Sequence, residues 1–326
     1  MKKCFKSIPM LFGVVSCNNT AESVNPVSTP QACTVYHHPS VNFNINNEQD
    51  ISETKPIENT ESSLVVSQNS IVNSNINIPE FDNRKKSSVL VYYEDDSSSP
   101  TTAGGTICGG LVISNTPTEA YVLTAAHCVQ KSGKLLVATG EKTNQLSEVV
   151  VVDKYAFYPG YTKSKENNAA EGDIAWLKLT TPLQNATAVP VWGNPGCLDK
   201  GTDTFIVGYG KVDSSEQTVI PNTQKNVGVV KFESYHTEPV VKHTLLFTSD
   251  TGTGACFGDS GAGATVAYGN LFVAIGLTHG VHKKLIPQLN VDNACSTGSS
   301  IYTAIGPYVD WIVDTSGINL NKVIIQ

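Results

Sequence analysis

Apolar residues fall in short runs along most of the chain, and polar or turn-forming residues separate these runs. The runs are rich in β-branched residues, and Gly, Asn, Pro and Ser lie between them, a pattern typical of β-strands joined by tight turns. We therefore expect an all-β sandwich or barrel. The expected strands cover residues 89–93, 111–114, 121–124, 135–139, 149–152, 174–179, 204–207, 228–232, 245–247, 264–266 and 271–275.

The end of the chain has a different pattern. Between residues 306 and 313, Tyr308, Trp311 and Ile312 occupy positions i, i+3 and i+4, which places them on one face of a helix. We expect this segment to be helical. The pattern indicates no particular structure for residues 318–326.

The N-terminus resembles an export signal. Lysines 2 and 3 precede a short apolar run at residues 8–15, which is too short to cross a bilayer. Residues 14–17 resemble the lipobox of bacterial lipoproteins, in which the cysteine, here Cys17, carries the lipid; ordinary cleavage near Ser16 is the alternative. We expect residues 1–17 to be the signal peptide, with Cys17 kept as the lipidated first residue of the mature chain in the first case and lost in the second. The protein would then be secreted, or periplasmic and outer-membrane-associated, where disulfides persist, and would contact a membrane only through lipid on Cys17.

Residues 18–70 are rich in Asn, Ser, Thr, Glu and Pro and poor in aromatic residues. Such a segment buries too little apolar surface to fold alone. We expect a largely disordered propeptide or linker, with His37 and His38 in solvent. The globular part is expected to cover residues 71–326.

Composition narrows the class of protein. The chain has 326 residues, of which 40% are hydrophobic and 16% charged, with a formal net charge of −7. The lysines are scattered, and nothing resembles the basic footprint of a nucleic-acid-binding protein. The negative charge mainly favours solubility.

Three residues in separate motifs suggest hydrolytic chemistry. Ser260 lies in the glycine-rich run 255–262, and a serine hydroxyl becomes a good nucleophile only beside a base. His127 ends an apolar, strand-like run and is the best candidate for that base. Asp173 opens the run 174–179 and is the best carboxylate to orient the histidine. Taken singly, they are equally typical of a turn serine, a core histidine and a strand cap.

Together these motifs resemble the trypsin/chymotrypsin-like serine protease family, in its order of His, Asp and Ser. The resemblance runs from residue 71 to about residue 313. It implies two antiparallel six-stranded β-barrels with a C-terminal α-helix, the chymotrypsin-like fold, and a serine endopeptidase acting on a protein or peptide substrate. Further matches lie at residues 108–114, 206–210, 301–303 and 308–312.

The resemblance also assigns a role to each residue. Ser260 would attack the scissile carbonyl, His127 would act as general base and then acid, and Asp173 would orient His127. The N–H groups of Gly258 and Ser260 would form the oxyanion hole. A non-catalytic binding homologue is an alternative, although all three catalytic positions are filled. An esterase-like hydrolase is a second alternative, but its Gly-x-Ser-x-Gly motif is broken by Ala262.

Ile71 and the three residues after it resemble the mature N-terminus of the family. The resemblance implies a zymogen in which cleavage before Ile71 frees an ammonium group that pairs with Asp259 and so holds the Gly258 N–H in place. Ser70 precedes the cut, where family zymogens commonly have Arg or Lys, so activation by another protease and self-cleavage both stay open. Alternatively, Ile71 only begins a strand.

The resemblance implies two disulfides, Cys108 with Cys128 and Cys256 with Cys295. Cys4 would leave with the signal peptide. A third disulfide between Cys33 and Cys197 would tether the propeptide to the protease domain and leave no odd thiol.

The resemblance places the floor of the specificity pocket at Gly254, followed by Ala255. Trypsin-like enzymes have an aspartate at this floor, and its absence argues against cleavage after Arg or Lys. Thr278, His279 and Gly280 resemble the Ser-Trp-Gly wall, with His279 in place of tryptophan. Ser300 stands where glycine is common, which would narrow the pocket. We expect cleavage after small or medium uncharged residues.

One alternative is a preference for acidic residues, through His279 together with Lys283 and Lys284. No metal or other cofactor is expected. Glu141 and Glu148 resemble the acidic residues of the family's calcium loop, but this loop is too short to supply six or more oxygen ligands.

Overall fold

The computed structural model describes residues 33–41, 82–94, 107–163, 170–211, 224–239, 241–269, 271–280 and 298–325. All of them belong to one compact unit, Ala32–Gln326. The predicted signal peptide, the predicted cleavage site before Ile71, Lys283, Lys284 and Cys295 lie outside the described residues.

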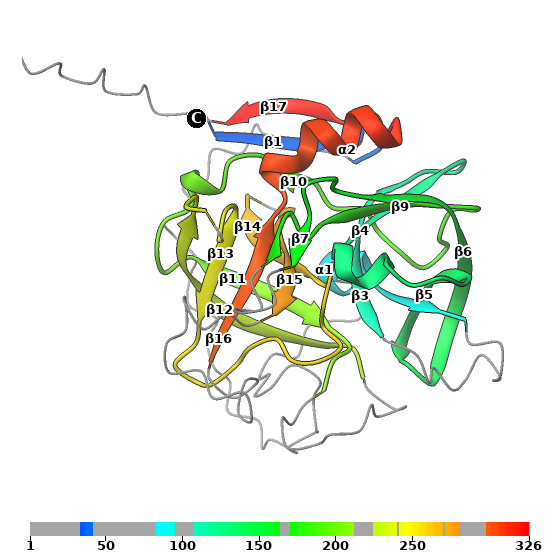
Figure 1. Ribbon diagram of the computed structural model, residues 1–326, viewed down its shortest axis with the longest axis horizontal. Coiled ribbons are helices and arrows are strands. Elements are labelled where there is room, and N and C mark those ends of the chain that lie inside the picture. Colours follow the sequence, from blue (N-terminus) through cyan, green and yellow to red (C-terminus); the bar gives the residue numbers. More distant parts are fainter. Residues whose placement is uncertain are drawn as a thin grey trace, which may run out of the picture. The chain divides into compact units, whose positions relative to one another are not determined.

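Six antiparallel strands close the first barrel (Figure 1). Their order around the barrel is β2-β3-β4-β9-β6-β5. Closure leaves no unpaired sheet edge, and the interior is filled mainly by valine and leucine side chains from every strand. The strands are β2 (Ser88–Tyr93), β3 (Cys108–Asn115), β4 (Ala120–Thr124), β5 (Leu135–Lys142), β6 (Gln145–Phe157) and β9 (Ala175–Leu179).

Six further antiparallel strands form the second barrel, in the order β14-β11-β12-β13-β16-β15, which a pairing of β14 with β15 closes. Its core is more aromatic: the Phe247 ring packs edge-on against Tyr302 at 4.9 Å and against Phe232 at 6.0 Å. The predicted pair of six-stranded barrels is therefore confirmed. The strands are β11 (Asp203–Gly208), β12 (Asn226–His236), β13 (Thr244–Thr248), β14 (Gly263–Tyr268), β15 (Leu271–Gly280) and β16 (Ser299–Ala304).

The C-terminal helix covers a third apolar cluster, to which strands of both barrels contribute. A 3-10 turn at Gly306–Tyr308 leads into α2 (Val309–Ser316), as the spacing of apolar residues predicts. Val309 and Ile312 are buried in the cluster beside Leu111 of β3 and Leu277 of β15. Gly317 ends the helix with a φ of 74°, a conformation that glycine adopts without strain.

Residues 33–41 correct one prediction. They form β1 (Cys33–His37) and a turn, instead of being disordered. β1 pairs antiparallel with β10 (Val191–Trp192) on one side and with β17 (Asn321–Ile325) on the other. His37 and His38 are only 9% and 8% exposed, so the expectation that they lie in solvent is wrong.

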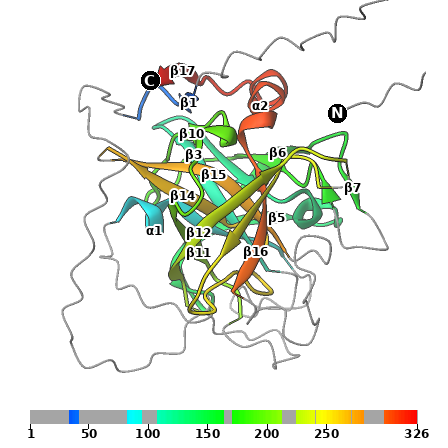
Figure 2. The ribbon, with the colours of Figure 1, turned by 90° about the vertical axis from the view of Figure 1, so that its left-hand side faces the viewer.

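The C-terminal tail, which the sequence left unassigned, is thus ordered by the segment predicted to be a propeptide. In both ribbon views β1 and β17 run side by side at the same end as α2 (Figures 1 and 2). β10 joins this pair to the second barrel by a parallel bridge from Val191 to Ala274 of β15. Pairing across such a long separation in sequence leaves no local signal, which is why the pattern of residues did not predict it.

Smaller elements complete the described chain. They are α1 (Asn83–Ser87), which Asp82 caps through the Arg84 N–H, the short strands β7 (Thr162–Lys163) and β8 (Ala170–Glu171), and the 3-10 helices η1 (Ala126–Val129) and η2 (Pro195–Cys197). None of the described helices has the length and apolarity needed to cross a membrane.

Candidate active site

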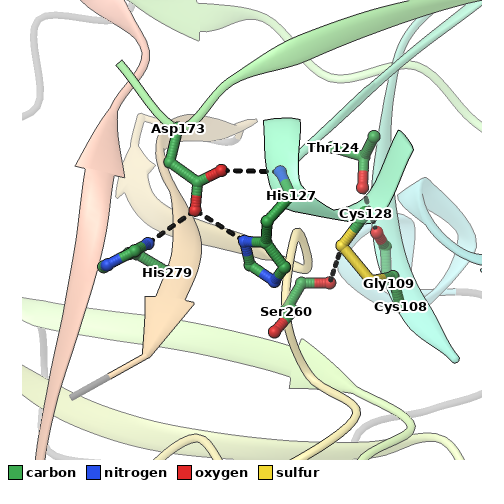
Figure 3. The surroundings of a disulfide bond; sticks show 8 residues. All are labelled: Cys108, Gly109, Thr124, His127, Cys128, Asp173, Ser260 and His279. Atoms are coloured by element: carbon green, nitrogen blue, oxygen red, sulfur yellow. Dashed lines mark hydrogen bonds and ion pairs between the residues drawn. A yellow bond between two sulfur atoms is a disulfide. The ribbon is translucent and has the colours of Figure 1, made fainter. Parts of the chain in front are cut away.

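Strand pairing brings His127 and Asp173 together although 46 residues separate them. β4 and β9 pair antiparallel, with Thr124 opposite Ala175, so the segment that follows β4 meets the segment that precedes β9. His127 lies in η1, and its Nδ1 is 2.7 Å from Asp173 Oδ2. The backbone N–H of His127 donates to Asp173 Oδ1 at 2.9 Å. His127 therefore forms a hydrogen bond with each oxygen of the carboxylate (Figure 3).

Asp173 is ionised at neutral pH despite complete burial of its side chain. Burial by itself raises the pKa of this carboxyl, but hydrogen bonds from His127 and His279 and their electrostatic interaction with the carboxylate outweigh it and hold the pKa below its usual range. An ionised carboxylate accepts the proton on His127 Nδ1. This tautomer leaves Nε2 with a free lone pair, as a general base requires.

Ser260 lies in the loop between β13 and β14 and faces this pair. Figure 3 shows the His127 ring between Asp173 and Ser260, with Nε2 on the serine side. No hydrogen bond joins Ser260 Oγ to His127 Nε2 in the described part of the chain; in enzymes without substrate this contact is often long. Ser260 O accepts the N–H of Gly109 of β3 at 2.7 Å, so the first barrel holds the serine loop in place.

Glycine at positions 258 and 261 allows the serine loop to turn. Gly258 has a φ of 100° and Gly261 a φ of 79°, a region that other residues rarely adopt. Asp259 N–H donates to Cys256 O, and Gly261 N–H donates to Thr278 O. Among the described residues, no acceptor engages the N–H of Gly258 or of Ser260. These are the two donors predicted to form the oxyanion hole, and both are available to a substrate oxygen.

Comparison with known proteins identifies the family. A sequence model described as Trypsin matches residues 82–312. The chain belongs to the trypsin family. It is accordingly a member of a serine endopeptidase family, and the three motifs predicted from its sequence lie within the matched region.

The chain is similar to several members of this family. It is 27% identical to human kallikrein-11 over 220 residues, 64% of this chain and 71% of that protein. It is 27% identical to mouse vitamin K-dependent protein C over 239 residues, but these cover 66% of the chain and 48% of that protein. Ovochymase of Halocynthia roretzi is 23% identical over 241 residues, 67% of the chain and only 14% of that protein.

A solved structure supports the fold. HL collagenase matches with a TM-score of 0.56 and 18% identity over 76% of this chain and 100% of that one. At this identity the likeness shows the chymotrypsin-like fold alone.

Asp259 is the second buried carboxyl of this trypsin-family site and is only 1% exposed. Its Oδ1 accepts the N–H of Gly210 at 2.6 Å, and its Oδ2 accepts the N–H of Cys256 at 2.9 Å. Burial raises its pKa to about 7, although backbone hydrogen bonds act in the opposite direction. No lysine, arginine or histidine among the described residues forms an ion pair with it. A buried carboxyl without a cation is costly to ionise.

His279 makes a contact that the resemblance did not imply. It is predicted to lie on the wall of the specificity pocket, and in the structure its Nδ1 is 2.5 Å from Asp173 Oδ2 and its side chain is 12% exposed (Figure 3). A bulge accompanies this contact, because Thr278 pairs with Tyr302 and Gly280 pairs with Ile301, which leaves His279 outside the ladder. The Thr278 hydroxyl donates to Ala262 O at 3.1 Å. Sequence reasoning therefore missed the contact of His279 with Asp173.

Two segments that carry predicted pocket residues lie near each other in the structure. A Cβ at Gly254 would meet no described atom nearer than the backbone N of Ser299, the residue before Ser300, at 4.0 Å. Ala255 is 8% exposed, and Ser300 of β16 is 1% exposed beside Ser299. Gly254, the predicted floor of the specificity pocket, thus contributes no side chain.

The disulfides agree with the predicted pairings as far as the described residues allow. Cys108 is bonded to Cys128, which ties η1 and therefore His127 to β3. Cys33 is bonded to Cys197, across 164 residues. Cys256 is also disulfide-bonded, and its expected partner, Cys295, lies outside the described residues. The contact of Cys128 Sγ with Ser260 O at 3.7 Å is one of packing, because a disulfide sulfur carries no proton.

Two groups of side chains among the described residues are close enough to hold a metal. In the first, which includes Cys108 and Cys128, both sulfurs belong to a disulfide. In the second, the nitrogens of His127 and His279 already lie at hydrogen-bonding distance from Asp173 Oδ2. A metal between them would require longer separations between the histidine nitrogens and this oxygen, because each metal bond is itself about 2 Å long.

Proposed function

We propose that the chain is the zymogen of a serine endopeptidase in which Ser260, His127 and Asp173 form the catalytic triad. The observation that supports this most directly is the hydrogen bond between His127 and the ionised Asp173, with Nε2 directed to Ser260. His127 Nε2 accepts the hydroxyl proton as Ser260 Oγ attacks the scissile carbonyl, and Asp173 stabilises the imidazolium that forms. His127 then protonates the leaving amine, and a water molecule repeats the sequence on the acyl-enzyme.

We assign stabilisation of the developing oxyanion to hydrogen bonds from the N–H groups of Gly258 and Ser260. Each donor in such a hole typically contributes a factor of about 100 to 1,000 in rate. Their lack of other acceptors among the described residues supports this assignment.

Activation is assigned to cleavage before Ile71, by another protease or by the enzyme itself. The new ammonium group would pair with Asp259, the buried carboxyl that has no cationic partner among the described residues. Asp259 also accepts hydrogen bonds from the backbone of Gly210 and Cys256, so a change at this carboxyl reaches the loop that carries Gly258.

Export is part of the same proposal. Residues 1–17 would act as the signal peptide and residues 18–70 as the propeptide. Cys17 would carry the lipid if the lipobox is used. The two disulfides with described partners are consistent with a compartment in which disulfides persist. The Cys33–Cys197 bond and β1 would keep the propeptide attached after cleavage.

For specificity we propose cleavage after small or medium uncharged residues. The open floor at Gly254 and the buried Ser300 beside it support this preference. A preference for acidic residues has less support, because His279 contacts Asp173.

Labelling with a fluorophosphonate probe tests the catalytic assignment. The chain cleaved before Ile71 should be labelled at Ser260 much faster than the uncleaved chain, and Ser260→Ala should not be labelled. Absence of label from the cleaved wild-type chain would refute the enzyme and favour a non-catalytic homologue. A peptide library then tests specificity, and a preference for Arg or Lys would contradict the proposed pocket.

A further inference from the structure

Asp173 holds two imidazoles on a single oxygen. Oδ2 lies 2.7 Å from His127 Nδ1 and 2.5 Å from His279 Nδ1. The two rings approach edge-on, with their centroids 6.2 Å apart and their planes at 77°. Figure 3 shows them on either side of the carboxylate, with only His127 lying toward Ser260.

We propose that His279 is a positioning residue for proteolysis, which fixes the carboxylate of Asp173 through the oxygen that orients the general base. The proposal rests on the catalytic roles proposed above. The terminal torsion of an aspartate is broad, so a carboxylate needs outside contacts to hold one orientation. The N–H of His127 holds Oδ1. Without His279, the only hydrogen bond to Oδ2 from the described residues would come from His127, which is the imidazole that the carboxylate has to orient.

The arrangement also makes the charge at the triad depend on His279. When His127 takes the serine proton, the imidazolium is stabilised by the negative charge of Asp173. A neutral His279 that donates from Nδ1 leaves this charge in place, whereas a protonated His279 cancels it. The catalytically competent state therefore has both imidazoles neutral, and the acid side of the rate profile should report two protons.

One further titratable group, Tyr161 from the segment after β6, interacts electrostatically with Asp173. Burial, followed by the charge of Asp173, raises the pKa of Tyr161 to about 12, so this phenol stays neutral during the assay.

The test compares three forms of the processed enzyme, wild type, His279→Ala and His279→Asn, with a peptide substrate taken from the library. The Asn amide nitrogen lies as many bonds from Cβ as Nδ1 does, so it donates to the same oxygen but does not titrate near neutral pH. His236→Ala is the matched control, because this histidine interacts with Ser234 and Glu238 on the surface of β12 and its neighbouring turn.

We expect His279→Ala to lower kcat by about 10- to 100-fold, the range for one hydrogen bond to a charged group, with KM nearly unchanged. His279→Asn should recover most of kcat, and its acid limb should follow one proton where the wild type follows two. His236→Ala should behave as wild type. A thermal melt of each variant identifies those that fail to fold, and if His279→Ala is among them, the acid limb of His279→Asn decides.

A folded His279→Ala enzyme with wild-type kcat would overturn the proposal, as would a two-proton acid limb in His279→Asn. A change in KM alone would also overturn the proposal and would indicate that His279 acts in the wall of the specificity pocket. If the processed wild type neither turns over substrate nor takes the fluorophosphonate label, the proposed function itself fails. That result is distinct from an active wild type that tolerates the loss of His279.

Discussion

Cleavage before Ile71 should change how the stability of the protein depends on pH, because Asp259 is buried without a cation in the described part of the uncleaved chain. Its pKa rises from 3.8 to about 7 on folding, as burial disfavours the charged form. The native state then binds more protons than the unfolded state across this interval, so stability is complete below about pH 4 and falls as the pH rises toward 7. Three pKa units at 1.36 kcal/mol each correspond to about 4 kcal/mol at neutral pH.

The ammonium group of Ile71 should restore this stability after cleavage. It is charged below about pH 8, so the ion pair with Asp259 exists between roughly pH 5 and 8. The free energy of unfolding is measured by urea denaturation of Ser260→Ala, which cannot digest itself, before and after cleavage by an added protease. We expect the two forms to differ little near pH 4, and the cleaved form to be more stable by up to about 4 kcal/mol near pH 7.

Asp259→Asn provides the control, because its side chain does not titrate and the gap between the two forms should become independent of pH. The reasoning is refuted if the uncleaved chain keeps constant stability between pH 4 and 7. It is also refuted if the gap between the cleaved and uncleaved forms is the same at both ends of this range.

Three further predictions concern the pocket, the serine loop and the tether. Gly254→Asp should add cleavage after Arg and Lys, measured with the peptide library, because a Cβ at this proposed pocket floor would meet no described atom nearer than 4.0 Å. Gly261→Ala should cost about 3 kcal/mol or more in urea denaturation, since its φ of 79° disfavours alanine and the new Cβ would overlap Thr124 Oγ1; wild-type stability would contradict the geometry. After cleavage of the wild type, the N-terminal fragment should separate from the rest of the chain only on a reducing gel. In Cys33→Ser the two parts should separate on any denaturing gel. Separation of the wild-type parts without reductant would show that the bond to Cys197 does not hold the fragment.

Much of the fold was predictable because it depends on local pattern. The alternation of apolar runs with turn residues marks strands wherever both faces of a sheet are covered, and all the expected strands are present. Val91, Val122 and Leu177 are examples whose burial follows from such runs. The helix was predictable for the same reason, since Tyr308, Trp311 and Ile312, whose spacing predicted it, all pack in the third apolar cluster.

The candidate site was predictable to a different degree. Ser260, His127 and Asp173 each lie in a motif that can be recognised without a structure, and the order of the three motifs identified the family. The contact between His279 and Asp173 was not predictable, because one bulged residue in β15 changes which side chain points to the carboxylate. The burial of His37 was not predictable either, since its surroundings come from residues near the opposite end of the chain.

By itself, the sequence determined the class of fold, the family and the three residues proposed for catalysis, because each depends on residue type and short-range spacing. Only the tertiary structure decided that β1 pairs with β17, that Asp259 lacks a cationic partner among the described residues, and that His279 shares an oxygen of Asp173 with His127. These features depend on register and on contacts between distant segments. Hydrogen-bond partners and burial are properties of the packed chain, and a run of residues specifies them only once its neighbours are in place.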